Sequence, residues 1–128
     1  MTDKITVAYF DGVAAKLIQI PSCPSLEELQ TLVEGYVEVL PLPKINPEGQ
    51  LLHLICNEEG KMLFPYQPSL FLKNQDGYLL DVVFGPCFIC GNIDSSGDTD
   101  IFYGLSKEDI DQIKTICGVD LSEKQGPN

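Results

Sequence analysis

Apolar and polar positions alternate in KITVAYF, residues 4–10, and VAAKLIQI, residues 13–20, follows as a second β-rich run. A period of two is typical of β-strands that bury one face. Asp11 and Gly12 lie between the runs. This pair favours a type I′ turn, in which both central residues take positive φ. The pattern therefore predicts a β-hairpin.

The next apolar positions recur at helical spacing. They are Leu26, Leu29, Leu32 and Val33. Ser25 precedes them, and Glu28 lies three positions after Ser25, which is the spacing of a capping box. We expect Gly35 to end this helix because glycine adopts the left-handed conformation without steric strain.

Residues 36–42, YVEVLPL, carry aromatic and β-branched side chains and predict a short strand. Pro41 and Pro43 end this strand or place it at a sheet edge, because proline cannot donate a backbone hydrogen bond. Residues 43–50 are expected to form a loop.

Two apolar runs, residues 51–56 and 61–66, flank the sequence NEEG at 57–60. A type I turn followed by a left-handed glycine joins strands through a G1 bulge, and asparagine favours the first turn position. We therefore expect a second hairpin. Glu58 and Glu59 are interpreted as solvated turn residues and not as catalytic carboxylates.

Residues 67–81 carry two signals. Ser69 is placed to cap one helical turn over residues 70–72, whereas Asp76 and Gly77 form a second turn pair. The segment is therefore ambiguous from sequence.

Residues 82–93, VVFGPCFICGNI, are strongly apolar and β-branched. They predict a central strand that begins after Gly85 and Pro86. A polar loop follows at 94–100, and residues 101–105, IFYGL, are expected to pair back across that loop as the last strand.

A second helix is predicted at 106–117. Ser106 is its N-cap, Asp109 lies near the capping-box position, and Gly118 ends it. Its apolar stripe consists of Ile110, Ile113, Ile116 and Cys117.

These elements predict an α+β fold, a mostly antiparallel sheet of hairpins with two capped helices packed on it. We expect one domain over residues 1–128, with a core at about 4–118 and a frayed tail at 119–128.

The charge is strongly acidic, with 19 Asp and Glu against 8 Lys, a formal net charge of −11 and no arginine. Direct nucleic-acid binding is disfavoured because phosphates would be repelled and arginine, the preferred phosphate ligand, is missing. A divalent cation or a basic protein surface would be attracted instead. The alternative is that the charge only keeps the protein in solution.

No apolar run reaches the ~18 residues that a membrane helix requires. The N-terminal residues also lack the basic and apolar regions of a signal peptide. We therefore expect a cytoplasmic protein without membrane contact. The sequence leaves monomer and homodimer both open.

The chain has five cysteines and one histidine. Cys87 and Cys90 form a CxxC motif without the second ligand pair of a zinc site. Residues three apart on a strand point to opposite faces, so neither this pair nor His53 with Cys56 is expected to converge. We predict ordinary core thiols, with no metal and no cofactor.

The most acidic region combines the loop at 94–100 with the start of the last helix. Its carboxylates are Asp94, Asp98, Asp100, Glu108, Asp109 and Asp111. The residue order of an EF-hand is missing. We expect an acidic protein-binding surface here.

Three segments occur together in a familiar order: LQTLVEGYVEVLPL at 29–42, LICNEEGKMLFPYQ at 54–67, and DVVFGPCFICGNID with GLSKEDI within 81–110. They resemble the small bacterial, phage and mobile-element family catalogued as domain of unknown function 3846. The chain departs from the family pattern at Glu34, usually glycine, and at Gln67, often asparagine. The resemblance implies an accessory protein of phages and integrated elements, without an established activity.

Two functions follow as expectations. The first is a non-enzymatic accessory protein that binds a host or defence protein through its acidic surface. The second is a nucleotide or signal binder with a pocket against the sheet. Its candidate ligand residues are Tyr36, Asn57, Lys61, Tyr66 and Gln67. No nucleophile, base or metal set points to an enzyme.

Overall fold

The computed structural model describes residues 3–42, 50–74, 76–118 and 121–123. Within these ranges the order of elements is β1 (Lys4–Phe10), β2 (Ala15–Pro21), α1 (Leu26–Val33), β3 (Val37–Pro41), β4 (His53–Asn57), α2 (Gly60–Leu63), β5 (Pro68–Lys73), β6 (Leu79–Phe84), β7 (Cys87–Cys90), β8 (Ile93–Asp94), β9 (Ile101–Phe102), α3 (Lys107–Cys117) and β10 (Ser122–Glu123).

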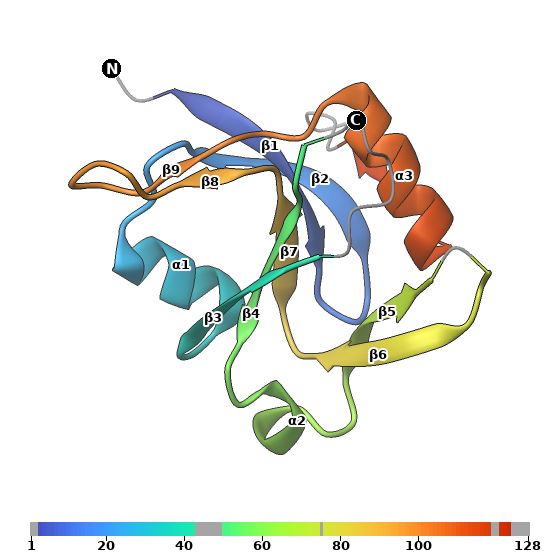
Figure 1. Cartoon of the computed structure of the whole chain (residues 1–128). Coiled ribbons are helices and arrows are strands. Elements are labelled where there is room, and N and C mark those ends of the chain that lie inside the picture. The colour runs from blue at the N-terminus through green and yellow to red at the C-terminus, as the bar shows by residue number, and fades with distance from the viewer. Residues whose placement is uncertain (1–2, 43–49, 75, 119–120, 124–128) are drawn as a thin grey trace.

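A six-stranded sheet in the order β10-β2-β1-β7-β4-β3 forms the centre of the molecule (Figure 1). Its pairs are antiparallel except for β10 with β2. β5 with β6 and β8 with β9 form two further antiparallel ladders. The predicted α+β class is confirmed, and β7 is the central strand expected after Gly85 and Pro86.

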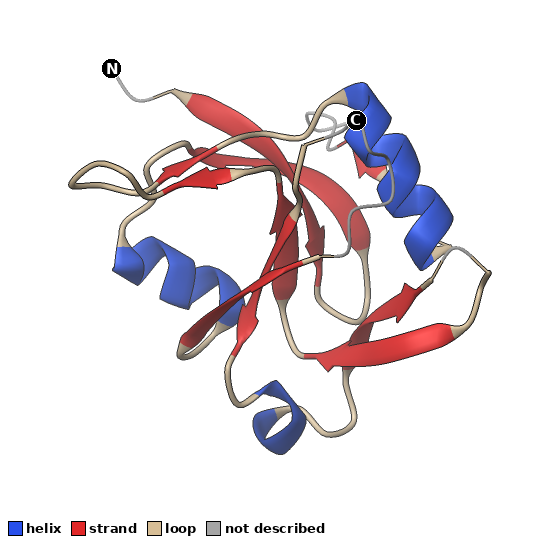
Figure 2. Ribbon diagram, viewed as in Figure 1, coloured by secondary structure: helices blue, strands red, loops and turns tan. Residues whose placement is uncertain are grey.

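Two hydrophobic clusters lie on the two faces of this sheet. Figure 2 shows α1 and α3 on opposite sides of its strands. Ile113 and Cys117 of α3 pack in one cluster with Leu70 of β5, and Val33 of α1 packs in the other. The central strand β7 contributes side chains to both clusters, because alternate side chains of a strand point to opposite faces. Cys87 therefore lies in the α3-side cluster and Cys90 in the α1-side cluster.

The predicted hairpin of β1 and β2 is confirmed, but its type I′ turn is wrong. Phe10 pairs with Ala15, so the loop contains four residues. Of Asp11 and Gly12, Gly12 alone has positive φ, at 92°. The Asp11 carboxylate accepts hydrogen bonds from the backbone N–H groups of Val13 and Ala14, both at 2.8 Å. These bonds from the Asp11 side chain stabilise the loop, so Asp11 does not need the positive φ that a type I′ turn requires.

Both predicted capping boxes are confirmed. Ser25 and Glu28 bond each other's backbone N–H groups at the start of α1, as Ser106 and Asp109 do at α3. Gly118 ends α3 with φ 66° as predicted. The predicted stop at Gly35 is wrong, because Glu34 is the C-cap of α1 and takes φ 58° itself.

The predicted hairpin between residues 51–56 and 61–66 is also wrong. β4 pairs with β3 and with β7, and the chain after Glu59 enters the one-turn helix α2. The first residue of α2, Gly60, lies so close to β6 that an added Cβ would overlap the backbone carbonyl of Phe84. Glycine is thus required here for close approach and not for a left-handed turn.

The ambiguous segment at 67–81 forms strands. Ser69 lies in β5 and donates to the Val83 carbonyl at 3.0 Å, so the alternative of a capped helical turn is wrong. The predicted turn at Asp76 and Gly77 lies between β5 and β6, and Gly77 takes the positive φ, 86°, that glycine favours. β9 pairs with β8 across the polar loop, as expected.

The prediction of a frayed tail at 119–128 is wrong for Ser122–Glu123, because these residues form β10 beside β2. The remaining tail positions, 119–120 and 124–128, lie outside the described residues, as do 43–49 of the predicted loop. The described part of the chain contains no helix long and apolar enough to cross a membrane.

Candidate functional site

The end of α1, the start of β3, the end of β4 and α2 meet at one corner of the molecule. The buried side chain of Asn57 holds them together. Its amide donates to the backbone carbonyls of Val33 and Glu34, both at 3.1 Å, and its oxygen accepts from the N–H of Glu59 at 2.7 Å. The three segments that carry the family resemblance therefore converge here, since Gly60 in turn contacts β6.

The backbone at this corner is closely packed. A Cβ on Gly35 would overlap the side-chain amide of Asn57. This close approach explains why the position is glycine although its φ is not positive. Glu34, directly before it, is the one described non-glycine residue with positive φ. The left-handed region is unfavourable for a residue with a side chain, so this corner is held by tertiary contacts.

A hollow of about 310 Å³ opens on the outside of this corner. It is lined by Gln30, Gly35, Tyr36, Glu59 and Leu63. Its lining residues Tyr36 and Leu63 are 62% and 52% exposed. Met62 and Tyr66, which lie within three positions of Leu63 in sequence, are 68% and 96% exposed. Exposed apolar groups gathered in one region are typical of interaction surfaces.

One carboxylate lines the hollow, and three others lie within two positions in sequence of its lining residues. Glu59 lines it, Glu34 precedes Gly35, and the N–H of Glu58 donates to the carbonyl of Tyr36 at 2.8 Å. Glu38 follows two positions after Tyr36 on β3. The nearby cation, Lys61, is 3.5 Å from Asp81, and this is the one ion pair between described residues. We call Tyr36, Met62, Leu63 and Tyr66, together with Glu34, Glu38, Glu58 and Glu59, the acidic-apolar corner.

The five candidate ligand residues lie near one another but do not line one pocket. Tyr36 lines the hollow, and Tyr66 projects into solvent. Asn57 is buried, with all its polar atoms bonded to backbone groups. Lys61 pairs with Asp81, and Gln67 donates to the carbonyl of Asp11. Of these five residues, Tyr36 is the one that lines this hollow.

The six carboxylates of the predicted acidic surface are divided. Asp94, Asp98 and Asp100 belong to β8 and the loop after it. Ile93 of β8 and Phe102 of the paired strand β9 pack in the α1-side cluster. Glu108 and Asp111 are exposed on α3, on the other face of the sheet.

Asp109 does not belong to any surface, because it is buried. It accepts from Ser106 N–H at 2.8 Å and from the Gln50 side-chain amide at 2.6 Å. The latter contact ties α3 to the segment before β4. The prediction of Asp109 as a surface residue is therefore wrong, and the acidic surface stays a prediction for the other five carboxylates.

The prediction of core thiols is confirmed for four of the five cysteines and is wrong for Cys23. Cys56, Cys87, Cys90 and Cys117 are buried free thiols, and Cys23 is exposed. Burial raises the pKa of Cys87 and of Cys90 to about 12, because desolvation disfavours the thiolate. The described residues contain no group of three potential metal ligands.

His53 and Cys56 lie on opposite faces of β4, as expected. Cys56 belongs to the α3-side cluster, and its thiol donates to the Glu38 carboxylate at 3.9 Å. The His53 ring lies 3.0 Å from the carbonyl of Gly91 through Nδ1. The imidazole is thus engaged by the backbone of the strand connection.

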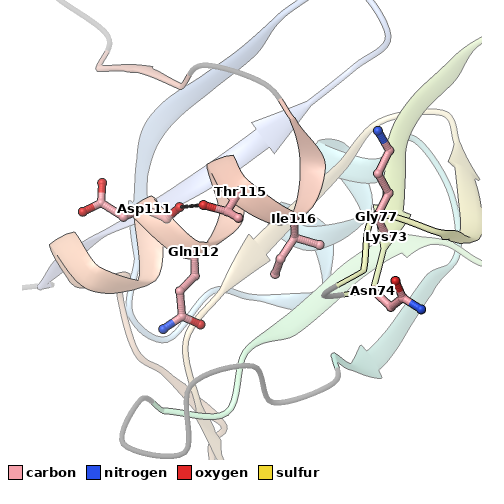
Figure 3. A pocket seen from close by; sticks show the side chains of 7 residues that line it. All are labelled: Lys73, Asn74, Gly77, Asp111, Gln112, Thr115 and Ile116. Atoms are coloured by element: carbon pink, nitrogen blue, oxygen red, sulfur yellow. Dashed lines mark hydrogen bonds between the residues drawn. The ribbon is translucent and has the colours of Figure 1, made fainter.

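A second hollow, of about 340 Å³, lies between α3 and the turn of the β5–β6 hairpin (Figure 3). It is lined by Lys73, Asn74, Gly77, Asp111, Gln112, Thr115 and Ile116. The Asn74 oxygen already accepts from the N–H groups of Asp76 and Tyr78, at 2.9 and 3.0 Å. Of the predicted site residues, this hollow contains Asp111 alone.

Gln30, Leu63 and Met62 were missed as site residues. Gln30 lies within a helix that the sequence does predict, so its place beside α2 depends on tertiary packing. Met62 and Leu63 lie in the run at 61–66, which the sequence predicts as the second strand of a hairpin. Their only sequence signal is their adjacency to the NEEG segment at 57–60.

Comparison with curated proteins and with solved structures finds no match. The family model described as Domain of unknown function (DUF3846) matches residues 5–118. This span includes every described element except β10 and the first residue of β1. The chain therefore belongs to the DUF3846 family.

Proposed function

We propose that this chain is a non-enzymatic accessory protein, of phage or mobile-element type, that acts in the cytoplasm by binding a basic host or defence protein. The acidic-apolar corner is its contact surface. The observation that carries this proposal is the exposure of Tyr36, Met62, Leu63 and Tyr66 beside carboxylates without a lysine partner among the described residues.

The two kinds of side chain would contribute differently to binding. Removing apolar groups from water contributes about 25 cal/mol per Å² in favour of a complex, and the lost freedom of the two partners opposes this contribution. The carboxylates steer a basic partner and exclude acidic ones, with an effect that weakens as salt rises. The formal net charge of −11 acts in the same direction at longer range.

The test is affinity capture from a lysate of the organism that encodes the chain. Three baits are compared: the wild type, a Glu38→Gln/Glu58→Gln variant at the corner, and an Asp98→Asn/Asp100→Asn control. All four side chains are exposed, and both variants remove two charges. We expect a basic protein that the wild type and the control retain and that the corner variant loses.

The proposal is wrong if no protein is reproducibly captured at low or high salt. It is equally wrong if both variants lose the same partner to the same extent. In that case net charge, and not the corner, would carry the interaction.

A second candidate function is the binding of a nucleotide or small signal molecule in the hollow between α3 and the β5–β6 turn. Its volume of about 340 Å³ suits a small ligand, and Lys73 supplies a positive charge. A thermal-shift screen with nucleotides tests this, because a ligand well above its Kd raises Tm. Unchanged melting curves for the wild type would remove this candidate.

A further inference from the structure

The outer edge of β3 has a defined hydrogen-bonding pattern. β3 is the last strand of the six-stranded sheet, beside β4. The N–H of Glu58 donates to Tyr36 O at 2.8 Å, and the N–H of Leu42 donates to Leu52 O at 2.9 Å. Tyr36 and Leu42 thus both bond toward β4, and bonding alternates along an antiparallel pair of strands. The even-numbered residues of β3 therefore bond to β4.

The odd-numbered residues consequently direct their backbone groups away from β4. Val37 and Val39 present N–H and carbonyl groups at the outer edge, and Pro41 presents a carbonyl alone. Among the described residues no strand pairs with this edge. Such an edge is a template for a further strand.

The side chains around this edge determine which strand it suits. Val39 and Leu40 are exposed, Glu38 lies between Val37 and Val39 in sequence, and β3 begins directly after Tyr36 of the hollow. A second copy of this chain would bring another net charge of −11 to the same edge. A basic segment meets no such repulsion.

We propose that the partner binds through an extended segment, with lysine or arginine side chains, that adds to β3 as a further strand. It bonds to the backbone of Val37 and Val39, and an apolar residue next to this segment occupies the hollow beside Tyr36 and Leu63. The inference rests on the proposed function and specifies its recognition mode, β-strand addition.

The test uses a displayed library of short random peptides selected on the full chain. Val39→Pro removes the outward N–H without removing a bond to β4, and Val39→Ala keeps that N–H while shortening the side chain. We expect enriched peptides rich in lysine or arginine that bind the wild type and Val39→Ala alike. They should bind Val39→Pro about tenfold more weakly.

Amide hydrogen exchange on the wild type gives a readout that does not depend on the folding of any variant. The N–H groups of Val37 and Val39 should exchange rapidly in the free chain and slowly with a selected peptide bound. Slow exchange of Val39 in the free chain would overturn the inference, because the edge would already be covered.

The remaining outcomes separate the inference from the proposed function. Basic peptides that bind folded Val39→Pro as well as the wild type would overturn strand addition and leave the acidic-apolar corner as a contact surface. A library that yields no basic peptide would overturn the inference and count against the proposed function. Two copies of the chain pairing through β3, seen as a dimer that Val39→Pro abolishes, would also overturn it.

Discussion

The side-chain amide of Asn57 donates to the carbonyl of Glu34 at 3.1 Å, at the residue where α1 ends in a left-handed conformation. The contact joins two positions 23 residues apart in sequence. It satisfies one of the carbonyls that a helix leaves unbonded at its C-terminus. The contribution of this corner to stability can be measured by replacing Asn57, Glu34 or Gly60.

Replacing Asn57 with alanine should destabilise the fold by about 2–4 kcal/mol, because buried backbone groups of Val33, Glu34 and Glu59 lose their partner. Urea unfolding gives the value. Asn74→Ala is the matched control, since the Asn74 oxygen caps an exposed turn, and we expect about 1 kcal/mol or less. Equal decreases in the free energy of unfolding for the two variants would show that the hydrogen bonds of Asn57 are no more important than those of an exposed turn.

Replacing Glu34 with glycine should raise the free energy of unfolding by about 0.5–1 kcal/mol, because glycine takes φ 58° without a side-chain clash. Glu34→Ala removes the same carboxylate but keeps a Cβ. Thermal unfolding of both variants separates the two effects. Stabilisation by alanine as large as by glycine would mean that charge, and not backbone strain, matters at this position.

Replacing Gly60 with alanine should destabilise the protein by about 1–3 kcal/mol, because the new methyl group would overlap the carbonyl of Phe84 and push α2 from β6. Gly97→Ala is the control, since its Cβ would meet no atom within 4 Å. Chemical denaturation of the two variants provides the comparison. A Gly60→Ala variant as stable as Gly97→Ala would contradict the close approach.

The buried thiols predict alkaline sensitivity. Burial raises the pKa of Cys56 and Cys117 to about 11 and of Cys87 and Cys90 to about 12, against 9.0 ordinarily. Because the folded state holds them neutral, their contribution to stability is complete below pH 9.0 and is lost as the pH rises toward about 12.

This sensitivity can be measured by urea unfolding between pH 8 and 11. Cys87→Ala should reduce the slope of stability against pH, by about 1.4 kcal/mol per unit at most, whereas Cys23→Ala should leave it unchanged because Cys23 is exposed. At neutral pH an alkylating reagent should modify Cys23 alone until the protein is unfolded. Rapid modification of Cys87 in the folded protein would contradict its burial.

Local signals in the sequence were reliable where neighbouring residues alone decide the structure. The Ser25–Glu28 and Ser106–Asp109 boxes form as predicted because each satisfies N–H groups of its own first turn. The candidate site was less predictable. Tyr36 was identified, but Leu63 and Gln30 belong to elements whose approach to each other depends on Asn57.

The sequence by itself determined the α+β class, the hairpin of β1 and β2, the two capped helices and the central place of β7, because periodicity, caps and turn residues act over a few positions. Only the tertiary structure decided the path after Asn57. There β7 occupies one side of β4 and β3 the other, so no edge of β4 remains for residues 61–66 to join as a strand. Because of this competition for hydrogen bonds, the chain enters α2 at Gly60–Leu63 instead of a strand, and apolar side chains such as Met62 and Tyr66 lie on the surface.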